Sequence, residues 1–199
     1  MLWGVVSFFY LCSTFWKEIR EQMKVELKDG SVLAHGRQLF KGLSFVARSG
    51  EVVCIVGGRG SGKTLLLRAL IGMWPLDEGV ASVDGAVVTP RSAPYLRKDM
   101  GYVPQDWPRD AYNDIVDVVS EVAERGCQVA FLDEPLTSQD DTTRQAVLQA
   151  VRKMVDEGMA VVLTCSEGDR LVGHVQGLSE SQMSFKFVEL WKYQSSDSV

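Results

Sequence analysis

The chain has 199 residues, of which 46% are hydrophobic and 24% are charged, and its formal net charge is −5. This length and composition suit one compact domain with a substantial core. The acidic balance and the lack of a basic block in the sequence argue against a nucleic-acid-binding surface, so no nucleic-acid partner is expected. Four cysteines lie far apart in the sequence without metal-ligand spacing, which favours reduced thiols in the cytoplasm.

The first 22 residues differ from the rest of the chain. The stretch 2–16 is mostly apolar and rich in aromatic residues, and a charged stretch, 17–22, follows it. The apolar stretch is shorter than the roughly 20 residues of a transmembrane helix and lacks the basic start of a secretory signal. Three interpretations stay open: a membrane-surface anchor, a docking helix for a partner, or an upstream stretch wrongly included before a natural start at Met23. We therefore separate residues 1–22 from a domain at 23–199, which is expected in the cytoplasm or, through an anchor, peripherally at the inner face of the membrane.

Hydrophobic periodicity predicts the secondary structure in chain order. Alternating patterns predict two early strands, at 23–27 and 43–47, and a hairpin at 80–88 that turns at Asp84-Gly85. Continuous apolar runs are typical of strands buried on both faces, and they occur at 51–56, 128–132 and 160–163. Shorter strands are predicted at 100–103 and 183–187, and helices at 63–71, 112–124 and 142–154. Buried strands that alternate with helices predict a parallel α/β core, to which the early strands and the hairpin add an antiparallel section.

A glycine-rich segment follows the first buried strand and precedes the first helix. The segment Gly57-Gly58-Arg59-Gly60-Ser61-Gly62-Lys63-Thr64 fits the phosphate-loop pattern G-x-x-x-x-G-K-[ST]. Glycines let backbone N–H groups turn toward an anion, and the helix N-terminus adds its positive end. Lys63 is expected to contact the β- and γ-phosphates of ATP, and the Thr64 hydroxyl to bind Mg²⁺.

The second buried strand ends in two carboxylates, Asp133 and Glu134. Asp133 is expected to hold the Mg²⁺ shell, through water, as carboxylates do in other phosphate-loop proteins. Glu134 is placed to polarise an attacking water as the general base. An acidic turn at a strand end is common in isolation, but the phosphate loop upstream favours the catalytic interpretation.

These motifs and their neighbours resemble the ATP-binding cassette (ABC) ATPases of transporters. The matching segments are Gly42-Leu43-Ser44-Phe45 with Ser49-Gly50-Glu51, Leu70-Ile71-Gly72 with Pro75, Gly79-Val80 and Asp84-Gly85, Gly101-Tyr102-Val103-Pro104-Gln105, Leu132-Asp133-Glu134-Pro135, and Thr137-Ser138-Gln139-Asp140. The resemblance covers roughly residues 23–170. It implies an α/β P-loop NTPase fold with an ABC ATPase-like mixed sheet, flanking helices and an antiparallel β-subdomain.

The same resemblance implies roles for two further residues and a choice of partners. Gln105 falls in the family's Q-loop, whose glutamine reaches Mg²⁺ and the attacking water, so it joins Glu134 as a catalytic residue. Asp140 falls on the aspartate of the D-loop. The implied partners are ATP with Mg²⁺ and either a membrane transporter subunit or a complete ABC ATPase subunit.

The sequence also departs from the family. The family's helical subdomain and its LSGGQ signature lie between the Q-loop and Walker B, but here only residues 106–132 separate Gln105 from Asp133, without LSGGQ. Most of that subdomain is therefore expected to be missing. The segment 178–182 resembles the signature but follows Walker B and lacks paired glycines, so we interpret it as a coincidence. Ser166 falls where the family has its switch histidine, and His35 falls near its adenine-stacking aromatic, although a solvated loop histidine is the plainer interpretation.

The departures change the expected mechanism. In ABC ATPases two subunits sandwich ATP, and the signature of one subunit caps the γ-phosphate held by the other. Without that cap we expect Mg-ATP binding to survive, and hydrolysis to be slow or to need a partner. The alternative is a catalytically weak, nucleotide-sensing interaction protein, against which the intact Glu134 speaks. A small P-loop kinase of another family is a weaker third interpretation.

Overall fold

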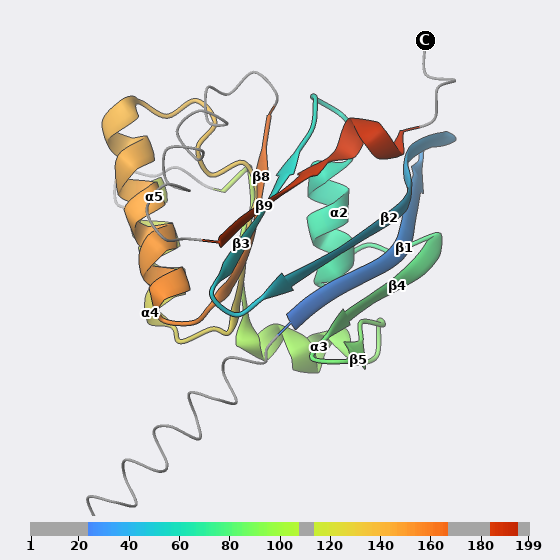
Figure 1. Ribbon diagram of the computed structural model, residues 1–199, viewed down its shortest axis with the longest axis horizontal. Helices are drawn as coiled ribbons and strands as arrows, with labels where there is room; N and C mark the ends of the chain where they lie inside the picture. Colours follow the sequence, from blue (N-terminus) through green and yellow to red (C-terminus); the bar gives the residue numbers. More distant parts are fainter. Residues whose placement is uncertain (1–23, 108–113, 167–183, 195–199) are drawn as a thin grey trace, which may run out of the picture.

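The computed structural model describes residues 24–107, 114–166 and 184–194. Among these residues, an antiparallel sheet with the order β2-β1-β4-β5 lies beside a parallel sheet with the order β6-β7-β8-β3-β9 (Figure 1). Helix α2 packs against β1 and β4 of the first sheet and against β8 of the second. The predicted parallel core with an antiparallel section is confirmed.

The antiparallel sheet begins with a long hairpin of β1 (Lys24–Ala34) and β2 (Arg37–Arg48). The two strands are longer than predicted because register shifts along β1 interrupt the alternation that the sequence pattern depends on. His35 lies exposed in the turn between them, at a φ of 52°. The predicted hairpin at Asp84-Gly85 is confirmed, and it joins β4 (Glu78–Val83) to β5 (Ala86–Val87).

The parallel sheet contains all three strands that were predicted to be buried on both faces. These are β3 (Glu51–Val56), β7 (Val129–Leu132) and β8 (Ala160–Cys165), and they occupy the interior of the sheet. The edges are β6 (Met100–Val103) and β9 (Ser184–Glu189), the latter paired along the whole of β3. The carboxyl ends of β3, β7 and β8 therefore meet at one edge of the sheet, as they do at ligand sites of open α/β sheets.

Helices cover the parallel sheet, with α4 (Ile115–Glu124) and α5 (Asp141–Asp156) on one face and α2 (Lys63–Leu70) on the other (Figure 1). Helix α4 begins with a capping box between Asp114 and Asp117; the predicted start at residue 112 lies outside the described residues. The sequence pattern missed α3 (Ala93–Leu96) and the 3₁₀ turns Arg97–Asp99 and Leu190–Tyr193, because elements this short show no periodicity.

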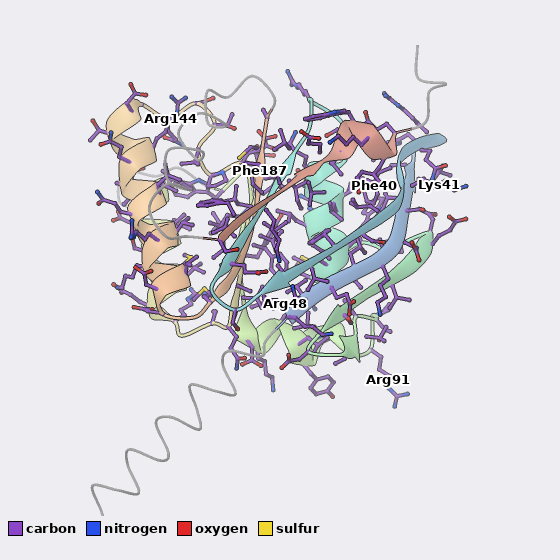
Figure 2. The ribbon with its side chains drawn as sticks, viewed as in Figure 1. Phe40, Lys41, Arg48, Arg91, Arg144 and Phe187 are labelled. Atoms are coloured by element: carbon purple, nitrogen blue, oxygen red, sulfur yellow. The ribbon has the colours of Figure 1, made fainter. Side chains whose placement is uncertain are left out.

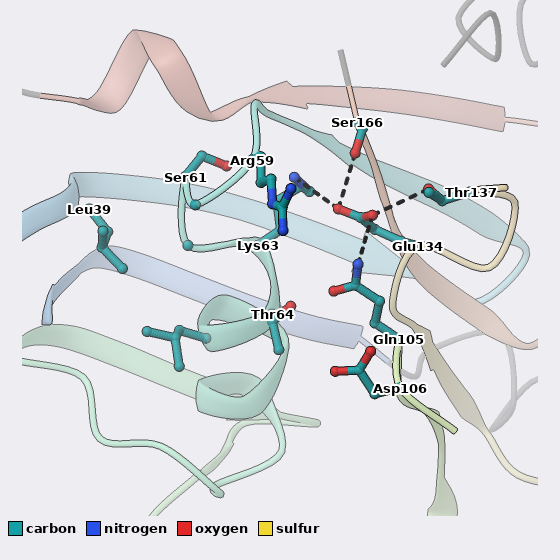
Figure 3. Close-up of a pocket in the computed structure, with 13 residues that line it drawn as sticks. Leu39, Arg59, Ser61, Lys63, Thr64, Gln105, Asp106, Glu134, Thr137 and Ser166 are labelled. Carbon is teal, nitrogen blue, oxygen red and sulfur yellow. Dashed lines mark hydrogen bonds and ion pairs between the residues drawn. The ribbon is translucent and has the colours of Figure 1, made fainter. Parts of the chain in front are cut away.

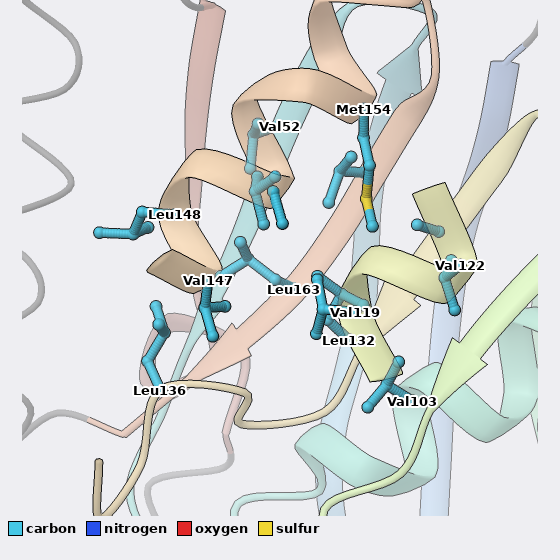
Figure 4. Close-up of a cluster of buried hydrophobic side chains, with 14 of the residues drawn as sticks. Val52, Val103, Val119, Val122, Leu132, Leu136, Val147, Leu148, Met154 and Leu163 are labelled. Atoms are coloured by element: carbon cyan, nitrogen blue, oxygen red, sulfur yellow. The ribbon is translucent and has the colours of Figure 1, made fainter. Parts of the chain in front are cut away.

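Two hydrophobic clusters fill the two faces of the parallel sheet. Side chains alternate along β3, so Val52 and Cys54 join the cluster under α4 and α5, whereas Val53 and Ile55 join the cluster around α2. Figure 4 shows the first cluster, in which Val119 of α4 and Val147 of α5 meet Leu163 of β8. In the second cluster, Phe40 is fully buried. The side chains of Lys41, Arg48 and Arg91, by contrast, are exposed at the surface of the domain (Figure 2).

Some predictions fall on segments of the chain that the structure does not describe. Residues 1–22, His174, the signature-like segment 178–182 and Met183 all lie outside the described residues. Among the helices of the described residues, none has the length and apolar character that would let it cross a membrane.

Candidate functional site

The phosphate loop connects the end of β3 to the start of α2, as its sequence predicts. Gly57 allows a close approach, since a Cβ there would lie 2.5 Å from the Ser61 hydroxyl oxygen. Gly62 stands at the helix N-cap with a φ of 99°, a left-handed conformation that favours glycine. The loop therefore wraps tightly around the N-terminus of α2, where unpaired backbone N–H groups attract an anion.

Lys63 is a buried cation at the centre of the site, with 4% of its surface exposed. Its ammonium donates to the carbonyl oxygens of Gly57, at 2.7 Å, and Gly58, at 2.9 Å. It also lies 3.0 Å from a carboxylate oxygen of Glu134. Buried charges need such partners, and because an ammonium has three N–H donors, a phosphate oxygen would have to replace one of them. The ammonium is thus fixed beside the phosphate loop, and its contact with a phosphate stays a prediction.

Glu134 gathers hydrogen bonds from three other segments of the chain (Figure 3). Its Oε2 accepts from Gln105 Nε2, at 3.1 Å, and from the Thr137 hydroxyl, at 3.2 Å. Its Oε1 accepts from the Ser166 hydroxyl, at 3.1 Å, beside the ammonium of Lys63. The residue has a φ of 48°, which is uncommon for a residue other than glycine and occurs at functional sites. The carboxylate is therefore held in one position at the mouth of the phosphate loop.

Asp133 is buried behind Glu134, with 1% of its surface exposed. Its Oδ1 accepts a hydrogen bond of 2.8 Å from the Thr164 hydroxyl. Burial raises the pKa of this carboxyl group, while the hydroxyls of Thr164 and Thr64 act in the opposite direction. Its Oδ2 has no hydrogen-bond partner among the described residues. The unpaired Oδ2 of Asp133 and the nearby hydroxyl of Thr64 are oxygen donors of the kind that Mg²⁺ prefers. The residues present therefore fit the expected cation.

A cavity of about 570 Å³ brings most of the predicted site residues together. Its lining includes Gln105, Glu134 and the loop residues Arg59, Gly60, Ser61, Gly62, Lys63 and Thr64, and it adds Leu39, Leu65, Asp106, Thr137 and Ser166. This volume lies within the usual range of ligand sites, roughly 300–1,000 Å³. The predicted site residues Gly57, Gly58 and Asp133 do not belong to the lining, and neither do His35 and Asp140. Asp140 instead caps α5 by accepting the Thr143 N–H at 2.7 Å, which lowers the pKa of this carboxyl group.

Two residues of the cluster around Glu134, Thr164 and Thr137, were not assigned to the site from sequence. Thr164 was left out because the predicted strand ended at Leu163, although a hydroxyl within an otherwise apolar strand is a signal that could have found it. Thr137 was placed in the D-loop, but its contact with Glu134 depends on the left-handed turn after β7. Both contacts depend on tertiary geometry, which a linear pattern does not contain.

Comparison with known proteins decides the family. Residues 40–172, well over half of the chain, match the sequence profile of the ABC transporter family. The chain belongs to the ABC transporter family. It is an ATP-binding domain of the ABC ATPase type, and ABC ATPases bind ATP, generally with Mg²⁺.

Curated relatives of this ABC domain are much longer than it is. The chain is 35% identical over 86 residues to the type I secretion system ATP-binding protein PrsD of Rhizobium meliloti, covering 43% of this chain and 15% of that protein. It is 26% identical over 198 residues to the ribose import ATP-binding protein RbsA of Bacillus licheniformis, covering 70% of this chain and 40% of that protein. The chain thus spans less than half the length of these relatives. The match to RbsA is 198 residues long, but only 70% of this 199-residue chain takes part in it. Within the matched region RbsA therefore has residues that this ABC domain lacks.

Solved structures confirm the fold. A putative ABC transporter ATP-binding protein from Pyrococcus furiosus has a TM-score of 0.63 at 16% identity, with 86% of this chain and all of that chain covered. A bacterial Atm1-family ABC exporter with ATP bound has a TM-score of 0.60 at 18% identity, with 85% of this chain and 38% of that chain covered. At these identities the likeness establishes the ABC ATPase architecture alone.

Proposed function

We propose that this ABC domain binds Mg-ATP at its phosphate loop and hydrolyses it slowly, or only with a partner that supplies the missing cap. The observation that supports this most strongly is the convergence of Lys63, Gln105 and Ser166 on the carboxylate of Glu134. A general base must be held in place next to the phosphate-binding group. The contacts of the Glu134 carboxylate hold it next to Lys63 in this way.

The proposed roles follow from the contacts. Backbone N–H groups of Gly57–Thr64 and the ammonium of Lys63 bind the phosphates, and the Thr64 hydroxyl and Asp133 hold Mg²⁺, Asp133 through water. The bound cation would neutralise charge on the phosphates. Glu134 takes a proton from the attacking water, and Gln105 orients both that water and the cation shell. Neutralising charge at Glu134 would also free the Lys63 ammonium for a phosphate oxygen.

The proposed partners are a membrane transporter subunit or a complete ABC ATPase subunit whose signature would cover this chain's ATP. With such a partner the domain would act in the cytoplasm or peripherally at the inner face of the membrane. The alternative of a nucleotide sensor explains the missing signature, but gives no reason to hold Glu134 with four polar neighbours.

Calorimetric titration with ATP tests the proposed binding. Lys63→Ala removes charge-assisted contacts worth about 1.5–3 kcal/mol, so affinity is expected to fall about 10- to 100-fold. Lys153→Ala, which removes an exposed lysine of α5, is the matched control and is expected to bind as the wild type does. Equal affinities for wild type and Lys63→Ala would reject the proposed phosphate site.

Phosphate release tests the proposed catalysis. Glu134→Gln keeps the side-chain shape but removes the base, and such groups contribute about 10²–10⁴-fold to rate. ATP affinity is expected to be maintained, because glutamine does not compete with phosphate for the Lys63 ammonium. Equal turnover by wild type and Glu134→Gln, alone and with a partner, would favour the sensor.

A further inference from the structure

Thr164 is the polar exception in the central strand β8. The other five residues of Ala160–Cys165 are apolar or thiol side chains, and all six are buried. A buried hydroxyl is costly unless its hydrogen-bonding groups are satisfied. The Thr164 Oγ1 donates to Asp133 Oδ1 and accepts the backbone N–H of Glu134, both at 2.8 Å. One hydroxyl therefore joins the side chain of one Walker B carboxylate to the backbone of the next.

The second of these bonds restrains an unfavourable backbone conformation. Glu134 has a φ of 48°, and this turn directs its carboxylate toward Lys63 rather than along the strand. Such conformations persist only where surrounding contacts hold them. The N–H of Glu134 is held by Thr164, across the gap between β7 and β8, so the turn is fixed to the rigid interior of the sheet.

Ser166 contacts the side-chain carboxylate of Glu134, whereas Thr164 contacts the backbone N–H of the same residue. It stands two residues beyond Thr164, and side chains two apart in an extended chain point the same way. Its hydroxyl donates to Oε1 of Glu134 at 3.1 Å, on the oxygen that also faces Lys63. The backbone and the carboxylate of Glu134 are thus restrained separately, by two residues of the segment 164–166.

We propose that Thr164 and Ser166 are a pair of positioning residues, in which Thr164 sets the backbone turn of Glu134 and Ser166 sets the rotation of its carboxylate. This rests on the proposed role of Glu134 as the base. Neither hydroxyl exchanges a proton with the reacting groups. Their function is to keep the carboxylate directed into the cavity when the ammonium of Lys63 turns to a phosphate.

Amide hydrogen exchange in the full chain, followed by NMR, tests the backbone restraint without any turnover. Thr164→Val keeps the shape of the side chain but cannot accept the N–H of Glu134, so that amide is expected to exchange about tenfold faster. The amides of Leu132 and Leu163, paired strand residues in the same protein, are the internal controls and are expected to change less than about twofold. Thr164→Ser keeps the hydroxyl and is expected to restore protection. An unchanged Glu134 amide in Thr164→Val would overturn the role of Thr164.

Kinetics test the carboxylate restraint. Ser166→Ala and Thr164→Val are each expected to lower kcat about tenfold or more, since small misplacements of a catalytic group cost that much. The Kd for ATP measured with EDTA is expected to stay within about twofold, and Ser166→Thr to recover kcat. Ser166→Ala is also expected to leave the exchange of the Glu134 amide unchanged, which separates the two roles. A rise in Kd with constant kcat would overturn the proposal in favour of a binding role.

The outcomes distinguish this inference from the proposed function. A wild-type protein that releases no phosphate under any condition would reject hydrolysis, and the exchange experiment would still decide whether Thr164 holds the turn. A wild-type protein that hydrolyses ATP with kcat insensitive to Ser166→Ala and Thr164→Val would reject the positioning pair alone. If Thr164→Val does not fold, Ser166→Ala against Ser166→Thr still decides the role of Ser166, because that residue lies half-buried beyond the strand.

Discussion

Two regions of this ABC domain differ in how many of the features expected of an ABC ATPase they contain. The phosphate edge, which comprises residues 57–64, 133–134 and 164–166, joins buried charges into one hydrogen-bonded cluster. Among its described residues, the β6–β7 connection at 104–128 contains a single helix, α4, which packs on α5, β6 and β7. The first region is proposed to hold phosphates, whereas the second is short where ABC ATPases carry their signature. We therefore expect holding ATP and closing over it to be separable properties of this domain.

The largest expected effect comes from supplying what the β6–β7 connection lacks. A complete ABC ATPase domain, with its own Walker B glutamate replaced by glutamine, is expected to raise phosphate release by this chain about 10²–10³-fold. The reason is that added backbone donors over the γ-phosphate stabilise charge in the transition state. Release is measured on the mixture and on each protein alone, with Lys63→Ala as the control. No stimulation at any ratio would contradict the capping partnership.

Asp133→Asn tests whether the phosphate edge holds Mg²⁺ as proposed. A partner that acts through water typically contributes about 10- to 100-fold to metal affinity. We expect the Mg²⁺ concentration that gives half-maximal ATP binding to rise by that factor, while affinity in EDTA is unchanged. Calorimetry over a Mg²⁺ series measures this, and Asp156→Asn, at an exposed position of α5, is the control. Equal Mg²⁺ dependence in both variants would remove Asp133 from the cation site.

Gly101→Ala tests how tightly the β6–β7 connection is packed. A Cβ at Gly101 would lie 2.3 Å from Cγ1 of Val122 on α4, so the helix or the strand must move. Such overpacking costs about 1–3 kcal/mol in the free energy of unfolding, measured by urea denaturation. Val122→Ala removes the obstructing methyl groups, and the double variant is expected to be less destabilised than the sum of the singles. Additive effects would show that α4 is not held against β6.

The smallest expected effect is at the exposed end of the same helix. Glu121 and Arg125 form an i,i+4 ion pair at 2.6 Å, with 62% of each side chain exposed. Exposed pairs of this kind contribute about 0.3–0.5 kcal/mol, so Glu121→Ala is expected to change the free energy of unfolding by no more than that. A loss above about 1 kcal/mol would indicate that α4 depends on its surface more than on its core contacts.

The sequence predicted the phosphate edge more completely than the rest of the fold. Lys63, Thr64, Asp133 and Glu134 belong to local patterns whose spacing is set by a strand end and a helix start, so a linear pattern locates them at the start of α2 and the end of β7, while their roles toward ATP and Mg²⁺ stay predictions. The buried strands β3, β7 and β8 were predicted for the same reason, since a run buried on both faces is apolar throughout.

Features that lack a local periodic signal, or that depend on contacts between distant segments, were not predicted. The strands predicted for the first hairpin were too short, because Asp29 and Gly30 fall at register shifts, where the alternation of side chains breaks. Helix α3 is four residues long and carries no periodic signal. The contact of Ser166 with Glu134 joins residues 32 positions apart, and it follows only from the parallel pairing of β7 and β8.

The place of β3 in the sheet has a consequence for how the protein is made. Val52 pairs with Val161 on one side and with Phe185 on the other, so both neighbours of this strand are synthesised long after it. At about 5–20 residues per second, the apolar strand that leads into the phosphate loop waits roughly 5–25 s for them. During that time its backbone groups and valine side chains are open to wrong partners, and chaperones have most to protect there. The cavity beside the phosphate loop is complete only after Ser166 has been synthesised, so a ligand of that cavity would stabilise the finished chain rather than the nascent one.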